Sequence, residues 1–113
     1  MNNILFRARM LNKEIKRSPE YNEYIKFGKM LQNNRELYNR FNEMRMKKYR
    51  LQSMQSQNSN EEGDRLMHEY ADIFQDENVH QFLVAEQRLC TIMKEVLMGI
   101  SDTLDFDLDF LHI

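Results

Sequence analysis

The stretch QFLVAEQRLCTIMKEVLMGI, residues 81–100, decides the fold of this chain. Its large side chains recur at alternating steps of four and three residues, which is the heptad spacing of one face of an α-helix. The members of this seam are Phe82, Glu86, Leu89, Met93, Val96 and Ile100. The pattern predicts a helix over residues 79–100 whose seam packs against other helices, so these residues are candidates for protein interaction.

Glu86 is the one polar member of the seam. A single polar residue among apolar ones can fix the register or the partner of a helix at some cost in stability. A Glu at the edge of a seam can also extend its carboxylate into water while its methylene groups pack. Both interpretations of Glu86 remain open at this point.

Periodicity and helix-start signals predict four more helices, over residues 3–17, 19–33, 35–57 and 64–75. Ser18-Pro19 is a start signal because the hydroxyl can accept a free backbone N–H and proline has no N–H to lose. The helix over 35–57 is expected to be the longest, and the polar stretch 56–63 is expected to be the main loop. We therefore expect an all-α fold, an antiparallel bundle of about five helices with one long central helix.

Composition agrees with one small helical domain. The chain has 113 residues, with three Gly and one Pro, and helix-forming residue types dominate. Its apolar runs are far shorter than the roughly 20 residues of a membrane span, and its N-terminus lacks the apolar core of a secretory signal. The single Cys90 cannot form an internal disulfide. We expect a cytoplasmic domain over residues 1–103, followed by a tail over 104–113, with no membrane partner.

Charge is divided unevenly along the chain. Residues 1–60 have a net charge of +8, and residues 61–113 have a net charge of −10. Such asymmetry is typical either of two halves that neutralise each other or of distinct partners. The basic helix Arg35–Arg50 also offers a possible nucleic-acid contact, because phosphate binding needs only clustered cations. The candidate residues are Arg40, Arg45, Lys47, Lys48 and Arg50.

The features of enzymes and metal sites are missing from the sequence. It has no glycine-rich phosphate loop, no nucleophile next to a base and no pair of Cys residues at metal spacing. His68 and Asp72 lie one helical turn apart, but no third ligand is identifiable. We expect no catalytic residues, no cofactor and no metal.

The tail alternates apolar and acidic residues. Leu104, Phe106, Leu108 and Phe110 alternate with Asp105, Asp107 and Asp109. A period of two predicts an extended strand, and acidic–apolar alternation is also typical of segments that dock to partners. A frayed end of the preceding helix is the third possibility. The four apolar tail residues are further candidates for protein interaction.

The order of these features resembles the YlbF/YmcA family of small helical bacterial regulators. The residues that carry the resemblance are Ser18-Pro19-Glu20-Tyr21, the middle helix with Phe41 and Gln52, Asn78-Val79, Phe82-Leu83 and the stretch from Ala85 to Leu89. The resemblance implies a self-associating all-α subunit without enzymatic activity, of a kind that influences competence, sporulation and biofilm formation. It also implies assembly with other family members and a link to RNase Y-dependent maturation of messenger RNA.

The chain departs from the better-studied members in its cysteines. Those members carry Cys residues toward the C-terminus, and their complex holds iron–sulfur clusters, whereas this chain has only Cys90. The iron–sulfur cluster is therefore not expected here. From the apolar helix stripes and the resemblance we expect a regulatory adaptor that forms a homo-oligomer, a dimer first of all, and that binds other family members or an RNA-processing complex. An RNA-contacting factor that uses Arg35–Arg50 is the alternative.

Overall fold

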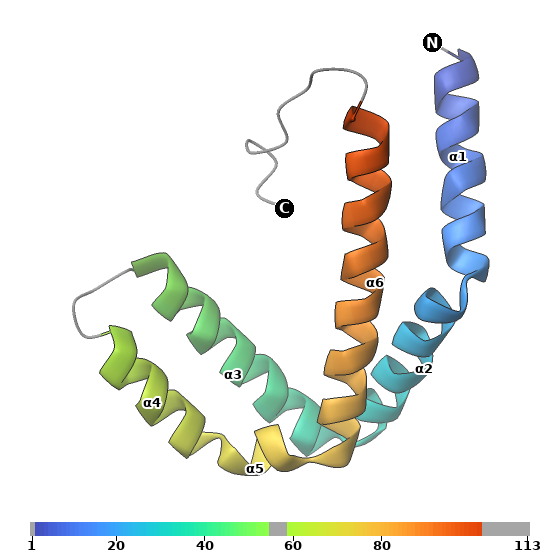
Figure 1. Cartoon of the computed structure of the whole chain (residues 1–113). Coiled ribbons are helices and arrows are strands. Elements are labelled where there is room, and N and C mark those ends of the chain that lie inside the picture. The colour runs from blue at the N-terminus through green and yellow to red at the C-terminus, as the bar shows by residue number, and fades with distance from the viewer. Residues whose placement is uncertain (1, 55–58, 103–113) are drawn as a thin grey trace. The chain divides into compact units, whose positions relative to one another are not determined.

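The computed structural model of the chain describes residues 2–54 and 59–102. These residues form six α-helices (Figure 1), namely α1 (Asn2–Arg17), α2 (Pro19–Asn33), α3 (Arg35–Met54), α4 (Ser59–Glu69), α5 (Ala71–Gln75) and α6 (Glu77–Ser101). The described residues contain no strand, which confirms the predicted all-α class. Within the same residues, no helix combines the length and the apolar composition of a membrane span.

Short polar side chains begin α2, α3 and α6 in the same way. Each accepts a hydrogen bond from the backbone N–H three residues further on, Ser18 from Tyr21 at 3.2 Å, Asn34 from Leu37 at 3.2 Å and Asp76 from Val79 at 3.1 Å. Such caps satisfy one of the N–H groups that a helix start leaves without a partner. The helix start predicted at Ser18-Pro19 is confirmed.

The region after α3 differs from the sequence prediction. The predicted loop over residues 56–63 is wrong in its second half, because α4 already begins at Ser59. Glu61 and Glu62 lie in the first turn of α4, where negative charge complements the helix dipole. The predicted single helix over 64–75 is also wrong, because the chain leaves helical geometry at Tyr70 (φ −108°, ψ 26°) and α5 follows. The described residues therefore form six helices, where about five were predicted for the chain.

Among the helices of residues 2–54 and 59–102, the longest is α6 and not α3. Helix α6 has 25 residues, since it begins directly after the Asp76 cap and so before the predicted start at residue 79. Helix α3 has 20 residues.

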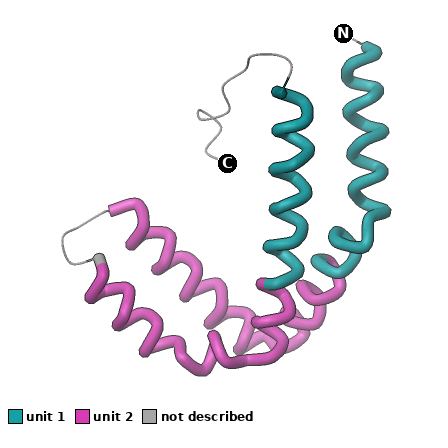
Figure 2. Tube along the Cα trace, in the orientation of Figure 1, with its two compact units in different colours: residues 1–24, 84–113 teal, residues 25–83 magenta. Residues whose placement is uncertain are grey.

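The chain divides into two compact units (Figure 2). Unit 1 comprises residues 1–24 and 84–113, and unit 2 comprises residues 25–83.

Unit 2 is built on an antiparallel pair of helices, α3 and α4, with α5 packed against both. Buried side chains from all of its helical segments form its core, namely Leu31, Phe41, Met44, Leu66, Tyr70, Ile73, Val79 and Phe82. The rings of Phe41 and Phe82 meet edge to face, with centroids 5.7 Å apart and an interplanar angle of 88°. A Cβ added at Gly28 would lie 3.4 Å from the ring of Phe82, which is ordinary van der Waals contact.

Unit 1 contains α1, the start of α2 and most of α6. Within this unit, α1 and α6 run in opposite directions (Figure 2). An ion pair links α6 to the start of α2, with Arg88 Nη1 3.3 Å from Glu23 Oε2. Of the described residues in this unit, only Ala85 is buried. Unit 1 therefore leaves much of its apolar surface exposed.

Candidate protein-interaction surface

The exposed apolar side chains of unit 1 form the candidate site. On α1 they include Ile4, Phe6 and Met10, which are 71%, 62% and 44% exposed, and on α6 they include Met93, Met98 and Ile100, which are 38%, 64% and 55% exposed. Exposed large apolar side chains are candidates for burial against a partner protein. We call these residues the unit 1 apolar surface.

The apolar side of α6 in unit 1 is wide. Between residues 84 and 101 the helix carries only four charged residues. Its apolar side chains occupy roughly half of the helix circumference at 3.6 residues per turn, including Leu89, Ile92, Met93, Val96, Leu97 and Ile100. Two members of this arc, Met93 and Ile100, remain exposed.

The predicted interaction seam is divided between the two units. Phe82 lies in unit 2, where it is buried against Phe41 as a core residue. Glu86, Leu89 and Val96 lie in unit 1 and are half-buried, and Met93 is more exposed. The other predicted interaction residues lie outside the described part of the chain, namely Leu104, Phe106, Leu108 and Phe110.

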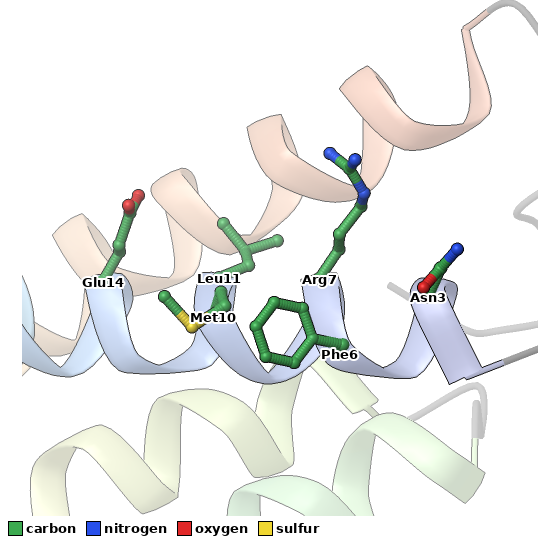
Figure 3. A pocket seen from close by; sticks show the side chains of 6 residues that line it. All are labelled: Asn3, Phe6, Arg7, Met10, Leu11 and Glu14. Carbon is green, nitrogen blue, oxygen red and sulfur yellow. The ribbon is translucent and has the colours of Figure 1, made fainter.

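A surface pocket of about 610 Å³ lies along α1 (Figure 3). It is lined by Asn3, Phe6, Arg7, Met10, Leu11 and Glu14. The stripe at helical spacing in the sequence runs through Ile4, Ala8, Leu11 and Ile15. Phe6 and Met10, four residues apart, form a second and shorter apolar pair, which the sequence analysis did not single out. Their i, i+4 spacing was the available signal.

Two of the candidate RNA-binding cations bind residues of their own unit. Arg40 forms an ion pair with Asp72, and its guanidinium lies 5.4 Å from the ring centroid of Tyr70. Lys47 Nζ lies 3.2 Å from Glu69 Oε1 and 5.1 Å from the same centroid. The two cations therefore flank the buried Tyr70 at the break between α4 and α5. In the sequence, only their spacing of seven residues indicated that Arg40 and Lys47 lie on the same side of α3.

The other candidate cations of α3 have different surroundings. Arg45 lies over the ring of Phe41, with its guanidinium carbon 5.2 Å from the centroid. Lys48 and Arg50 are exposed, and so is Tyr49 between them. The five predicted nucleic-acid residues therefore differ in their surroundings. Two of them, Arg40 and Lys47, bind acidic partners within unit 2.

These contacts change the pKa of Lys47 and of Asp72. The hydrogen bond to Tyr70, and then the one to Glu69, raises the pKa of Lys47. The hydrogen bond from Arg40, helped by the positive charge of that guanidinium, lowers the pKa of Asp72 below its usual value of 3.8. Both shifts favour the charged form of the group in the folded protein.

Acid should weaken the fold of unit 2 partly through Asp72. Because the folded-state pKa of Asp72 is lowered, its contribution to stability is fully present above the usual pKa and is lost as pH falls through the folded-state pKa. Urea unfolding as a function of pH measures this contribution. Asp72→Asn should reduce the loss of stability toward acid, whereas the exposed control Asp64→Asn should not. Equal profiles for the two variants would contradict this assignment.

The candidate metal residues His68 and Asp72 lie in different helices, α4 and α5. Asp72 binds Arg40, and His68 is exposed. Residues 2–54 and 59–102 contain no group of three His, Cys, Asp or Glu side chains placed to hold a metal ion. Cys90 is exposed on α6.

Comparison with known proteins places the chain in a family. A family model described as "Control of competence regulator ComK, YlbF/YmcA" matches residues 4–105, nearly the whole chain. A search of curated proteins and a search of solved structures each found no match. The family resemblance of the sequence is thereby confirmed, and the chain belongs to the YlbF/YmcA family, which is named for control of the competence regulator ComK.

Proposed function

We propose that this chain is a non-catalytic cytoplasmic regulator that acts by binding other helical proteins, first of all a second copy of itself. The unit 1 apolar surface carries the proposal. Self-association would use its α6 members, Met93, Met98 and Ile100, each of which is at least 38% exposed. Exposed large apolar side chains favour association, because each one that becomes buried contributes roughly 1.5–3 kcal/mol.

A twofold dimer is the simplest assembly that covers this surface. In such a dimer the same patch of both copies forms the interface, so one self-complementary apolar surface is sufficient. Several of the exposed residues are methionines, whose flexible side chains adapt to irregular surfaces. The same surface would also accept a related helical subunit, which is consistent with an adaptor in a family of regulators.

The wider partners follow from the family and not from the geometry. By analogy with its relatives, the chain would join other family members in a complex linked to RNase Y and to maturation of messenger RNA. In this role it would position other proteins without reacting with a substrate.

Sedimentation of the purified chain tests self-association. We expect a dimer at micromolar concentration that resists added salt, because apolar burial depends little on ionic strength. The matched control is the double variant Met54→Gln with Met67→Gln, which removes two exposed methionines of unit 2 and should leave the dimer intact. A monomer at high micromolar concentration would contradict the proposal.

RNA contact through α3 is the second candidate function. The observation in its favour is the exposure of Lys48 and Arg50 on either side of an exposed Tyr49, which could stack on a base. The pairing of Arg40 and Lys47 with acidic residues counts against it. An RNA affinity that falls by orders of magnitude between low and moderate salt, and that Lys48→Ala with Arg50→Ala removes, would favour this function over the first.

A further inference from the structure

The pocket on α1 has an apolar floor that the described residues leave exposed. Phe6 and Met10 lie next to each other along the helix (Figure 3), and both are exposed. By helical periodicity they lie on a different side of α1 from Leu11 and Ile15, which are half-buried. The apolar pair is therefore available to a ligand other than α6.

The charge around this pocket selects an acidic ligand. Helix α1 carries five cations, Arg7, Arg9, Lys13, Lys16 and Arg17, against the single Glu14. Within the described part of the chain, neither Arg7 nor Arg9 nor Lys13 takes part in an ion pair. A ligand for this face should combine large apolar groups with negative charge.

The C-terminal segment of the chain has that chemistry. Residues 104–113 contain three Asp and no Lys or Arg, and their large apolar residues alternate with the carboxylates. In an extended chain, side chains two residues apart are separated by roughly 6.6–6.8 Å. This spacing is close to the roughly 5–6 Å between residues one helical turn apart, such as Phe6 and Met10. Two successive apolar side chains of the segment can therefore contact both residues.

The segment also starts at the right end of unit 1. Because α1 and α6 are antiparallel, the end of α6 lies at the same end of the unit as the start of α1 (Figure 2). The eleven residues after Asp102 span up to about 36 Å when extended, whereas the pocket residues Asn3 to Glu14 cover about 17 Å of helix. The reach is sufficient, and attachment to the same unit raises the effective concentration of the segment.

We propose that residues 104–113 bind in extended form to α1 of the same chain, with their apolar side chains on Phe6 and Met10. Their carboxylates would lie on the outer face, where the long side chains of Arg7, Arg9 and Lys13 can reach around to them. The segment would then cover the exposed Phe6–Met10 side of α1. This proposal does not require self-association, because it uses the Phe6–Met10 side of α1 and not the exposed seam of α6.

A tryptophan in the segment reports its docking in the full-length chain. The chain has no Trp, so Phe110→Trp introduces a single indole. We expect blue-shifted emission and protection from acrylamide, both independent of protein concentration. Emission typical of an exposed indole would overturn the proposal, and so would a shift that disappears on dilution, because that result requires a second copy.

Variants of the pocket test the contacts in the Phe110→Trp background. Phe6→Gln or Met10→Gln should lower the ratio of docked to undocked segment about tenfold, the factor that corresponds to about 1.4 kcal/mol. Met67→Gln, an equally mild change at an exposed methionine of unit 2, should have no effect. Equal effects of Met10→Gln and Met67→Gln would overturn the assignment to α1.

Charge reversal tests the electrostatic part separately. Arg7→Glu with Lys13→Glu should release the segment, whereas the control Lys26→Glu with Lys29→Glu, on exposed residues of α2 in unit 2, should not. Unchanged docking in the first variant would overturn the role of these cations. Circular dichroism verifies that each variant stays helical, and sedimentation of the same samples reports self-association independently of docking.

Discussion

Replacing Phe41 with Ala should lower the free energy of unfolding by about 3–5 kcal/mol, the usual range for deleting a buried aromatic ring. Phe41 is only 1% exposed, and its ring meets Phe82 edge to face in the core of unit 2. The variant would lose the apolar burial of the ring, the aromatic contact and the surface over which Arg45 lies. Urea unfolding followed by circular dichroism measures the change.

Met46 provides the matched control on the same helix. It is 58% exposed, so Met46→Ala should change the free energy of unfolding by less than about 0.5 kcal/mol. If Phe41→Ala and Met46→Ala have similar small effects, the placement of the α3 core face is wrong.

Replacing Met93 and Ile100 together with Glu should abolish self-association. Both residues belong to the exposed arc of α6, and burying an unpaired carboxylate in an apolar interface costs several kcal/mol. We expect the dissociation constant to rise by about a thousandfold or more, because every 1.4 kcal/mol corresponds to a factor of ten. Sedimentation over a concentration series measures the change.

The control for this experiment introduces the same charges elsewhere. Met54→Glu with Met67→Glu adds two carboxylates at exposed methionines of unit 2 and should leave the dissociation constant within a few-fold of the parent. Both variants should keep their helical circular dichroism, because all four positions are exposed or partly exposed. A dimer that survives Met93→Glu with Ile100→Glu would place the interface outside this surface.

The acidic tail was predicted as a strand, a docking peptide or a frayed helix end, and residues 104–113 lie outside the described part of the chain. All three possibilities stay predictions, and the tryptophan experiment tests the second, the docking peptide. The docking experiment tests Phe6 and Met10 on α1, whereas Met93→Glu with Ile100→Glu tests self-association through α6. The two experiments can therefore fail independently.

The family and the helical class could be predicted from sequence because their signals are local or run along the whole chain. The heptad steps of residues 81–100 predicted a long helix, and the match over residues 4–105 confirmed the family. The start of α2 was equally predictable, since Ser18 binds a backbone N–H only three residues away. Such a cap needs no other part of the fold.

Other features depended on residues that are distant in the sequence. The break at Tyr70 has no local Pro or Gly to announce it, and it coincides with a ring that Arg40 and Lys47 of another helix flank. The sequence suggested that both cations could bind RNA, because the acidic partners that neutralise them lie 32 and 22 residues away in the chain. Clustered cations in a sequence do not reveal which of them are already neutralised.

The sequence by itself determined which side chains share a helix face, and only the tertiary structure decided what lies opposite them. Phe82 and Ile100 are members of the same heptad seam, yet Phe82 is buried in unit 2 and Ile100 is 55% exposed in unit 1. Periodicity is a property of one helix and sets its apolar stripe. Burial requires a second surface at each position along that stripe, and helices from distant parts of the chain supply that surface for Phe82 but not for Ile100.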